Sequence, residues 1–222
     1  KGKYLGTFGS LGAISFHETK NFTCGEGGAL LVNDPQYIDR ALIIREKGTD
    51  RHRFLEGQVD KYTWVDLGSS YLMSDISAAI LWAQLEAREK IQAKRRQIWD
   101  RYFDQLKPWA QKWGIRLPFV PDYCEQAYHL FYLLMPSGEV RASFIRYLKS
   151  KNISSTFHYI PLHLSSMGGR FGAQKGDCPQ TESLSERLVR LPFYYGLTET
   201  DQLRVISEIV KYQPDFSSVM NQ

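Results

Sequence analysis

The sequence is poor in cysteine and contains no long hydrophobic run. Its three cysteines, Cys24, Cys124 and Cys178, are odd in number and widely spaced, which argues against a disulfide framework and against a zinc site. No apolar stretch approaches the ~20 residues that span a bilayer, and no signal peptide opens the chain. We therefore predict a cytoplasmic protein with neither a metal nor a membrane partner.

A strong excess of one charge is also absent. The formal net charge is +4 over 222 residues, and the densest basic group, Lys94-Arg95-Arg96, lies inside a helical pattern and is interpreted as a solvated face. So small and dispersed a charge argues against nucleic acid as a partner and suits a small anionic substrate such as a nucleotide diphosphate. The composition, 43% hydrophobic and 23% charged, is that of an ordinary globular protein.

Strand and helix patterns are mixed along the chain, which predicts the α/β class. The apolar runs 11–16 and 29–32 are typical of strands, and the second is expected to be buried. A helix is predicted from the N-cap Ser74 to about residue 106, with a buried first half and its end near Pro108. Further elements are expected at 35–47, 127–135, 139–149, 153–159, 181–188, and after the N-cap Thr198 with its capping-box partner Asp201.

A polar cluster stands between the first two apolar runs. Five polar residues, His17 to Asn21, and the nearby Ser15 precede a glycine-rich stretch, Cys24-Gly25-Glu26-Gly27-Gly28. Glycine lets the backbone turn with positive φ or pass close to a ligand. A lysine held between buried strands is a candidate for amine chemistry, because removal from water favours the nucleophilic neutral amine. A solvated surface charge is the alternative for Lys20.

The segments SFHETKN and GEGGALLVND closely resemble the active-site segment of the DegT/DnrJ/StrS family of nucleotide-sugar aminotransferases. The resemblance implies the aspartate-aminotransferase type of fold (PLP fold type I) and the cofactor pyridoxal 5'-phosphate (PLP). It implies that Lys20 forms the Schiff base with PLP and that Ser15 binds the PLP phosphate; a strand-end serine bonding the backbone is the alternative for Ser15. Residues 1–106 would form the C-terminal part of the PLP-binding large domain with a long bridging helix, and 107–222 a small α/β domain.

Other segments match the family less closely. GSSYLMSD takes the place of the motif G-x-N-x-R-M, with Ser70 at the asparagine position, which implies contact with the PLP phosphate of a neighbouring subunit in a homodimer; a helix-entry role is the alternative. FHYIPLH resembles Y-x-P-L-H, which implies that Tyr159 and His163 approach the sugar. Residues 48–70 are interpreted as an ordered crossing loop or lid, and 160–180 as a second long loop. Within 48–70, Arg51 is a candidate ligand for the diphosphate, with solvated charge as the alternative.

The sequence segments KYTW, GSSYLMSD and LWAQLEA narrow the implied reaction. They resemble members that aminate dTDP-4-keto-6-deoxy-D-glucose to dTDP-4-amino-4,6-dideoxy-D-galactose with L-glutamate, for surface polysaccharide such as enterobacterial common antigen. The alternatives are a 3-keto or other nucleotide-sugar aminotransferase, a non-catalytic regulatory or scaffold relative, and a PLP-dependent sugar dehydratase, against which Lys20 argues because histidine replaces the lysine there. The chain is expected to be the C-terminal part of a longer enzyme and to bind PLP poorly alone.

Overall fold

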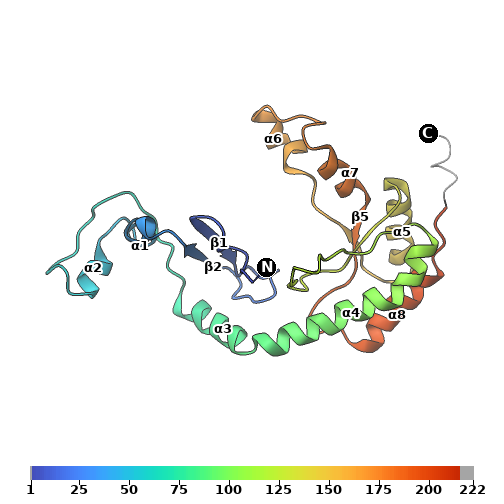
Figure 1. Cartoon of the computed structure of the whole chain (residues 1–222), viewed down its shortest axis with the longest axis horizontal. Helices are drawn as coiled ribbons and strands as arrows, with labels where there is room; N and C mark the ends of the chain where they lie inside the picture. The colour runs from blue at the N-terminus through green and yellow to red at the C-terminus, as the bar shows by residue number, and fades with distance from the viewer. Residues whose placement is uncertain (1, 216–222) are drawn as a thin grey trace. The chain divides into compact units, whose positions relative to one another are not determined.

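The computed structural model describes residues 2–215 and divides the chain into two compact units, Lys1–Glu89 and Lys90–Gln222. Both contain helices and strands (Figure 1), which confirms the expected mixture, and every strand pairing among the described residues is antiparallel. The boundary between the two units, after Glu89, falls near the start of a long helix. The functional division expected at residues 106 and 107 stays a prediction.

The first unit is built around one β-hairpin. Strand β1 (Leu11–Ser15) pairs with β2 (Gly28–Val32), with Leu11 opposite Val32 and Ser15 opposite Gly28. This register places the intervening polar segment at the open end of the hairpin. The helical elements follow in the order η1 (Pro35–Tyr37), α1 (Ile38–Arg45), α2 (Arg51–Leu55) and α3 (Asp75–Glu86).

Two predicted helix starts are confirmed by their caps. The Asp34 carboxylate accepts a hydrogen bond from the Gln36 amide, with Pro35 as the first helical residue, although this first turn is a 3-10 turn. The Ser74 hydroxyl accepts from the Ser77 amide at the start of α3. Both caps satisfy an amide that the helix itself leaves unpaired.

The segment 48–70 is ordered, as expected, and contains α2. The Gly48 carbonyl accepts hydrogen bonds from the amides of Val65 and Asp66 at 2.8 and 3.0 Å. The Asp50 carboxylate accepts from the Thr63 amide at 2.6 Å. Gly48 has a φ of 75°, and a Cβ there would lie 1.8 Å from the Asp66 carbonyl oxygen, so only glycine fits the closure of this loop.

The expected burial of β2 and of the first half of α3 is wrong for the described residues. Leu30 in β2 is 55% exposed and Ile76 in α3 is 76% exposed. Burial requires a second apolar layer, and a two-stranded sheet with a few short helices provides little of it. In the described part of this unit the buried side chains are Cys24, Ile43, Glu46 and Asp50.

The single helix expected from residue 75 to 106 is instead two helices. Helix α3 ends at the C-cap Ala87, and α4 runs over Arg88–Lys112 with Pro108 inside it. A proline inside a helix lacks an amide donor and its ring crowds the carbonyl four residues earlier, so the helix continues past it only where other contacts compensate. Trp109 and Ala110 are buried after it, and the Trp109 indole donates to the Tyr212 carbonyl at 3.0 Å. This packing carries α4 beyond the proline.

Part of the basic group in α4 is also buried, contrary to the expected solvated face. Arg95 is 7% exposed and donates to the backbone carbonyls of Tyr128, at 2.8 Å, and His129. Its guanidinium lies 5.0 Å from the centre of the Phe193 ring, and burial lowers the pKa of Arg95. Arg95 follows Ile91 by four residues on the core-facing side of α4, so helical spacing places it inside.

The second unit packs helices against a three-stranded sheet. Strand β5 (Leu188–Arg190) lies between β3 (Tyr132–Leu134) and β4 (Thr156–Phe157). The strands predicted at 127–135 and 153–159 are therefore shorter, and the central strand was missed because three residues give too little periodicity. The helices are α5 (Gly138–Ser150), η2 (Leu162–Leu164), α6 (Ser166–Arg170), α7 (Pro179–Arg187) and α8 (Glu199–Lys211).

A buried polar side chain joins α8 to α4, which lie side by side (Figure 1). Gln202 is fully buried; its amide nitrogen donates to the Ile98 carbonyl at 2.6 Å, and its amide oxygen accepts from Arg101 at 2.8 Å. The surrounding core is aromatic and aliphatic. Its fully buried members include Ile98, Tyr102, Leu106, Phe131, Leu133, Met135, Phe144, Leu148, Val189 and Ile209.

Candidate active site

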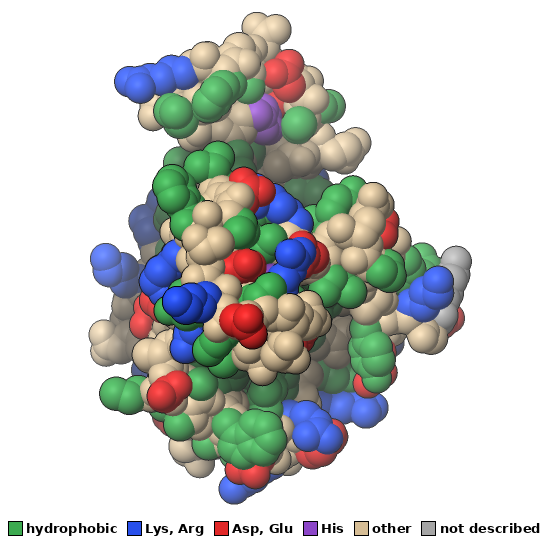
Figure 2. Space-filling model, turned by 90° about the vertical axis from the view of Figure 1, so that its left-hand side faces the viewer, with side chains coloured by type: hydrophobic (Ala, Val, Ile, Leu, Met, Phe, Trp, Pro, Cys, Tyr) green, Lys and Arg blue, Asp and Glu red, His purple; other side chains and the backbone are tan. Residues whose placement is uncertain are grey.

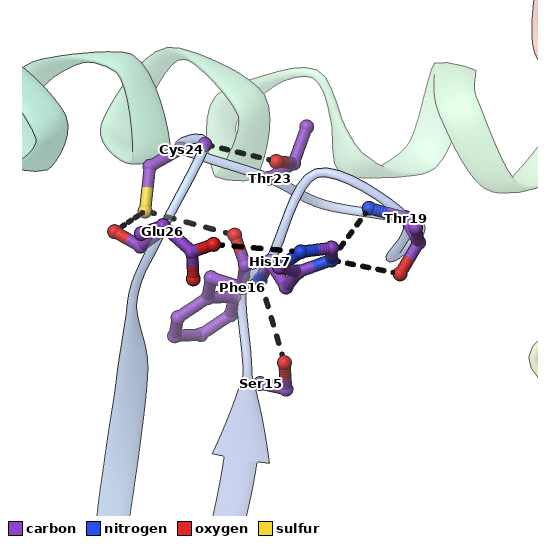
Figure 3. Close-up of polar contacts among 8 residues, drawn as sticks. Ser15, Phe16, His17, Thr19, Thr23, Cys24 and Glu26 are labelled. Atoms are coloured by element: carbon purple, nitrogen blue, oxygen red, sulfur yellow. Dashed lines mark hydrogen bonds and ion pairs between the residues drawn. The ribbon is translucent and has the colours of Figure 1, made fainter.

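The loop between β1 and β2 is closed at its base by the backbone. Phe16 donates its amide to the Gly27 carbonyl at 2.7 Å, and the Phe16 carbonyl accepts from the Cys24 amide at 3.0 Å. Within the loop, the Lys20 amide donates to the His17 carbonyl at 2.9 Å. The hairpin ladder therefore continues past Ser15 and holds residues 17–23 as a compact turn (Figure 3).

A thiol fills the space under this loop. Cys24 is 6% exposed, and its Sγ lies 3.4 Å from the Glu26 carbonyl oxygen and 3.9 Å from the Met73 sulfur. A Cβ on Gly27 would lie 2.6 Å from both the Cys24 Sγ and the Met73 methyl carbon. The absence of a side chain at Gly27 thus lets Met73, three residues after Ser70, pack onto the loop.

Lys20 and Ser15 both lie on this loop and its supporting strand. Lys20 is exposed, not enclosed between buried strands as expected, and its amine makes no hydrogen bond or ion pair with any residue that the structure describes. The Ser15 hydroxyl oxygen accepts the His17 amide at 3.4 Å, which is the local backbone bond foreseen as the alternative. That bond uses a lone pair, so the Ser15 hydroxyl proton remains available to an anion.

Ser70 is held beside the end of α1. It pairs with Glu46 in an isolated β-bridge, and the amide of its neighbour Tyr71 donates to the Arg45 carbonyl at 3.0 Å. These bonds fix the entry to α3, which agrees with the helix-entry alternative. The structure records no contact between Ser70 and Lys20 within the described residues, and the phosphate role of Ser70 stays a prediction.

The Arg51 guanidinium already has a partner. It donates to the carboxylate of Glu46, whose side chain is 8% exposed, and this hydrogen bond raises the pKa of Arg51. Nearby, the carboxylate of Asp39 binds Arg53 at 2.7 Å and His52 at 3.0 Å, and these bonds lower the pKa of Asp39. Contact between Arg51 and a diphosphate would have to compete with Glu46, so it stays a prediction.

The candidates of the second unit lie on the segment between β4 and β5. His163 Nε2 lies 2.9 Å from the Glu182 carboxylate, and both side chains are largely buried. The Gly176 amide donates to the same carboxylate oxygen at 2.7 Å. The bond from His163 and that from Gly176 lower the pKa of Glu182. Tyr159 is 71% exposed, with the Arg190 guanidinium 5.6 Å from its ring centre; substrate contact by Tyr159 and His163 stays a prediction.

Three side chains around the Lys20 loop were missed by sequence reasoning. His17 Nδ1 accepts from the Thr19 amide at 3.2 Å, and Nε2 lies 3.4 Å from the Glu26 carboxylate (Figure 3). Cys24 and Met73 form the apolar support described above. The spacing of a polar side chain two residues before an amide was the available signal for His17, whereas no local pattern marks the Cys24–Met73 contact.

One known protein family matches almost the whole chain. The model of the DegT/DnrJ/EryC1/StrS aminotransferase family matches residues 1–210. The chain belongs to this family. The resemblance carried by SFHETKN and GEGGALLVND is therefore confirmed at family level, and the Lys20 loop is the candidate active-site loop of a DegT/DnrJ/EryC1/StrS family member.

Relatives of this family member span a wide range of organisms. The uncharacterised protein MJ1066 of Methanocaldococcus jannaschii is 33% identical over 95% of this chain and 56% of its own. GDP-perosamine synthase of Escherichia coli O157:H7 is 29% identical, over 97% of this chain and 55% of the synthase. The structure of the PMP form of the putative sugar aminotransferase Spr1654 from Streptococcus pneumoniae is 25% identical, with a TM-score of 0.80. The match covers 94% of this chain and 54% of Spr1654. The chain thus spans about half the length of the proteins it matches.

The surface carries charges of both signs. Figure 2 shows acidic and basic side chains interspersed over the face drawn there. Among residues 2–215, no helix is long and apolar enough to cross a membrane, and no cluster of three or more potential metal-ligating side chains is found in the same range.

Proposed function

We propose that this chain acts in a PLP-dependent nucleotide-sugar aminotransferase of the aspartate-aminotransferase fold (PLP fold type I). The observation that carries the proposal is the unpaired amine of Lys20 on the loop closed between β1 and β2, in a chain of an aminotransferase family. The proposed division of labour gives PLP binding to residues 1–106 and a small domain to 107–222. A cytoplasmic homodimer is the proposed assembly.

The residues on this loop suit PLP, whose reactive groups are an aldehyde and a phosphate. A primary amine forms a covalent imine with an aldehyde. Lys20 supplies such an amine, and no residue that the structure describes forms a hydrogen bond or ion pair with it. The free Ser15 hydroxyl proton suits a phosphate oxygen, where a charge-assisted hydrogen bond is strong. Ser70 is the proposed further phosphate donor. When bound, PLP supplies an electron sink for the carbon undergoing proton exchange.

Lys20 has a second proposed role once it is free of the cofactor. Its Nζ then accepts a proton from the carbon of the amino donor and later delivers one to the carbon that receives the amino group. An arginine would fail in both roles because its guanidinium stays protonated. A glutamate has no amine to join to the aldehyde.

The proposed reaction moves the amino group of L-glutamate to the 4-keto carbon of dTDP-4-keto-6-deoxy-D-glucose, giving dTDP-4-amino-4,6-dideoxy-D-galactose for surface polysaccharide such as enterobacterial common antigen. Its support is the KYTW…GSSYLMSD…LWAQLEA wording and the mild positive charge. The kinship with a protein named GDP-perosamine synthase supports a nucleotide-sugar substrate more generally. Tyr159, His163 and Arg51 are the proposed substrate contacts.

Reductive trapping tests the cofactor part of the proposal. The protein is saturated with PLP, reduced with borohydride, digested and mapped by mass spectrometry. We expect a pyridoxyl group on the peptide containing Lys20, its loss in Lys20→Arg, and its retention in the matched control Lys61→Arg. A label spread over surface lysines, or none on Lys20, would instead identify a non-catalytic relative.

A substrate panel tests the reaction. Glutamate-dependent amination is measured for dTDP- and GDP-linked 4-keto and 3-keto sugars, with Lys20→Arg as the inactive control. The proposal expects the highest kcat/KM for dTDP-4-keto-6-deoxy-D-glucose. A preference for a 3-keto sugar would overturn the substrate while leaving the covalent role of Lys20 intact.

A further inference from the structure

The side chain of His17 lies inside the loop that carries Lys20 and bonds along it in two directions. Its Nδ1 lies 3.2 Å from the Thr19 amide nitrogen and 3.0 Å from the Thr19 hydroxyl. Its Nε2 lies 3.4 Å from a carboxylate oxygen of Glu26, on the other side of the loop (Figure 3). One ring thus connects the residue before Lys20 to the part of the loop that returns toward β2.

The donor properties of these groups fix the form of the ring. A backbone amide can only donate, so Nδ1 of His17 must accept the bond from Thr19. The proton of the neutral imidazole is then on Nε2, which faces Glu26. The backbone adds a second bond, because the His17 carbonyl accepts the Lys20 amide at 2.9 Å. His17 therefore binds the amides of both Thr19 and Lys20.

The two contacts of the His17 ring, with the Thr19 amide and with Glu26, contribute unequally to holding the loop. The Glu26 side chain is 85% exposed, and exposed charge pairs contribute little because water screens them. The Thr19 bond lies within the turn and supplies the acceptor that the amide of this non-regular segment lacks. Of the two contacts of the ring, the bond from the Thr19 amide to Nδ1 therefore does most to hold the 18–19 peptide, while the His17 carbonyl holds the amide of the 19–20 peptide.

We propose that His17 is a positioning residue for Lys20: its Nδ1 holds the 18–19 peptide beside the bond from the Lys20 amide to the His17 carbonyl, and the two together fix the direction in which the lysine side chain leaves the loop. This extends the proposed function, because orientation matters only if Lys20 reacts. The structural part, the bond from the Thr19 amide to Nδ1, can be tested whether or not PLP is bound.

Substitutions can separate the two bonds of the ring. In His17→Asn the amide oxygen takes the place of Nδ1 and can accept an amide two residues on, as in an Asx turn, but nothing reaches Glu26. In His17→Gln the amide nitrogen takes the place of Nε2, and the short-range acceptor is lost. His17→Ala removes both bonds, and Glu26→Gln keeps an acceptor while removing the charge.

Amide hydrogen exchange of the cofactor-free protein tests the structural part. We expect exchange of the Thr19 amide to rise roughly tenfold in His17→Ala and His17→Gln, the loss of one hydrogen bond of ordinary strength, while the Lys20 amide keeps its bond to the carbonyl of residue 17. His17→Asn and Glu26→Gln should exchange like the wild type. Nitrogen-15 NMR of the ring should show Nε2 protonated and Nδ1 bare at neutral pH. Equal exchange in all variants, or a proton on Nδ1, would overturn the proposal.

The reaction tests the functional part. With PLP bound, the same hydrogen-bond loss predicts a kcat about tenfold lower in His17→Ala with KM for the sugar unchanged, and recovery in His17→Asn. Unchanged kcat in His17→Ala, with Lys20 labelled in the wild type, refutes the positioning role. If the wild type itself carries no pyridoxyl label on Lys20, the proposed function fails, and the exchange experiment still decides the role of His17 in the loop.

Discussion

Replacing Gly27 with alanine is expected to displace the loop that carries Lys20. The new Cβ would lie 2.6 Å from the Cys24 Sγ and from the Met73 methyl carbon, roughly 1 Å inside the normal separation of packed atoms. The Met73 methyl is the end of a flexible side chain and can turn away. The Cys24 thiol is buried and lies against the Glu26 carbonyl, so the backbone around residue 27 must move instead.

The magnitude follows from these two neighbours. Overpacking typically costs about 1–3 kcal/mol, and the mobility of Met73 places Gly27→Ala in the lower half, at about 1–2 kcal/mol. Local opening of the hairpin should then be roughly 5–30 times more frequent. If Cys24 is the main obstacle, adding Cys24→Ala should recover about half of the loss, which a double-mutant cycle reports as coupling between the two positions.

Hydrogen exchange of the peptides covering 11–32 measures this opening directly, and borohydride labelling of Lys20 reports whether the amine is still presented. Gly9→Ala is the matched control: it lies in the same unit, lacks a positive φ, and its added Cβ would meet its nearest neighbour, the Leu11 carbonyl oxygen, at an ordinary 3.7 Å. Equal protection in Gly27→Ala, Gly9→Ala and the wild type would refute the packing described for Cys24 and Met73.

Three further predictions concern stability. Gln202→Leu should lower the free energy of unfolding by about 2–3 kcal/mol in urea, because two buried hydrogen bonds are lost; a cost below about 0.5 kcal/mol would contradict the α4–α8 bridge. Gly48→Ala should cost at least about 1–3 kcal/mol and raise hydrogen exchange throughout 48–66; wild-type exchange there would contradict the tight closure. The lowered pKa of Glu182, due first to His163, means that its stabilisation is complete above the ordinary carboxyl pKa and is lost as pH falls through the lowered value. The thermal midpoints of wild type and Glu182→Gln should therefore converge on acidification below about pH 4.5; a constant difference would contradict the linkage.

Local signals in the sequence correctly predicted where several helices begin. Ser74 and Thr198 are confirmed as N-caps. Thr198 and Asp201 also pair as expected, although the Asp201 carboxylate accepts from the Thr198 hydroxyl, where the capping box has the backbone amide of the N-cap as donor. Such a signal is complete within four residues. It does not depend on the rest of the fold.

Features that depend on distant partners were predicted less well. Ile76 was expected inside and Arg95 outside, and the structure reverses both. A helical stripe shows which residues share a face, but not what lies opposite that face. Pro108 was expected to end its helix, and the packing of Trp109 overrides that local preference.

The candidate site shows the same division. The motif around Lys20 placed the lysine on a loop after a strand, and the structure agrees. The bond from the Thr19 amide to His17 exists only in the closed conformation of that loop, and the contact between Cys24 and Met73 joins residues far apart in the chain. No local spacing predicts the contact between Cys24 and Met73, whereas the two-residue spacing of His17 and Thr19 was an available signal for their bond.

The position of β5 between β3 and β4 has a consequence for how this chain can diversify. Because β4 and β5 are adjacent and antiparallel, residues 158–187, which include η2, α6 and α7, leave the sheet and return to it at neighbouring points; α6 and α7 can be followed in Figure 1. A segment whose two ends join adjacent strands can change in length or composition at little entropic cost to the rest of the fold. This segment can therefore be exchanged as a cassette between homologues, which would let selection remodel it while the aromatic core stays the same.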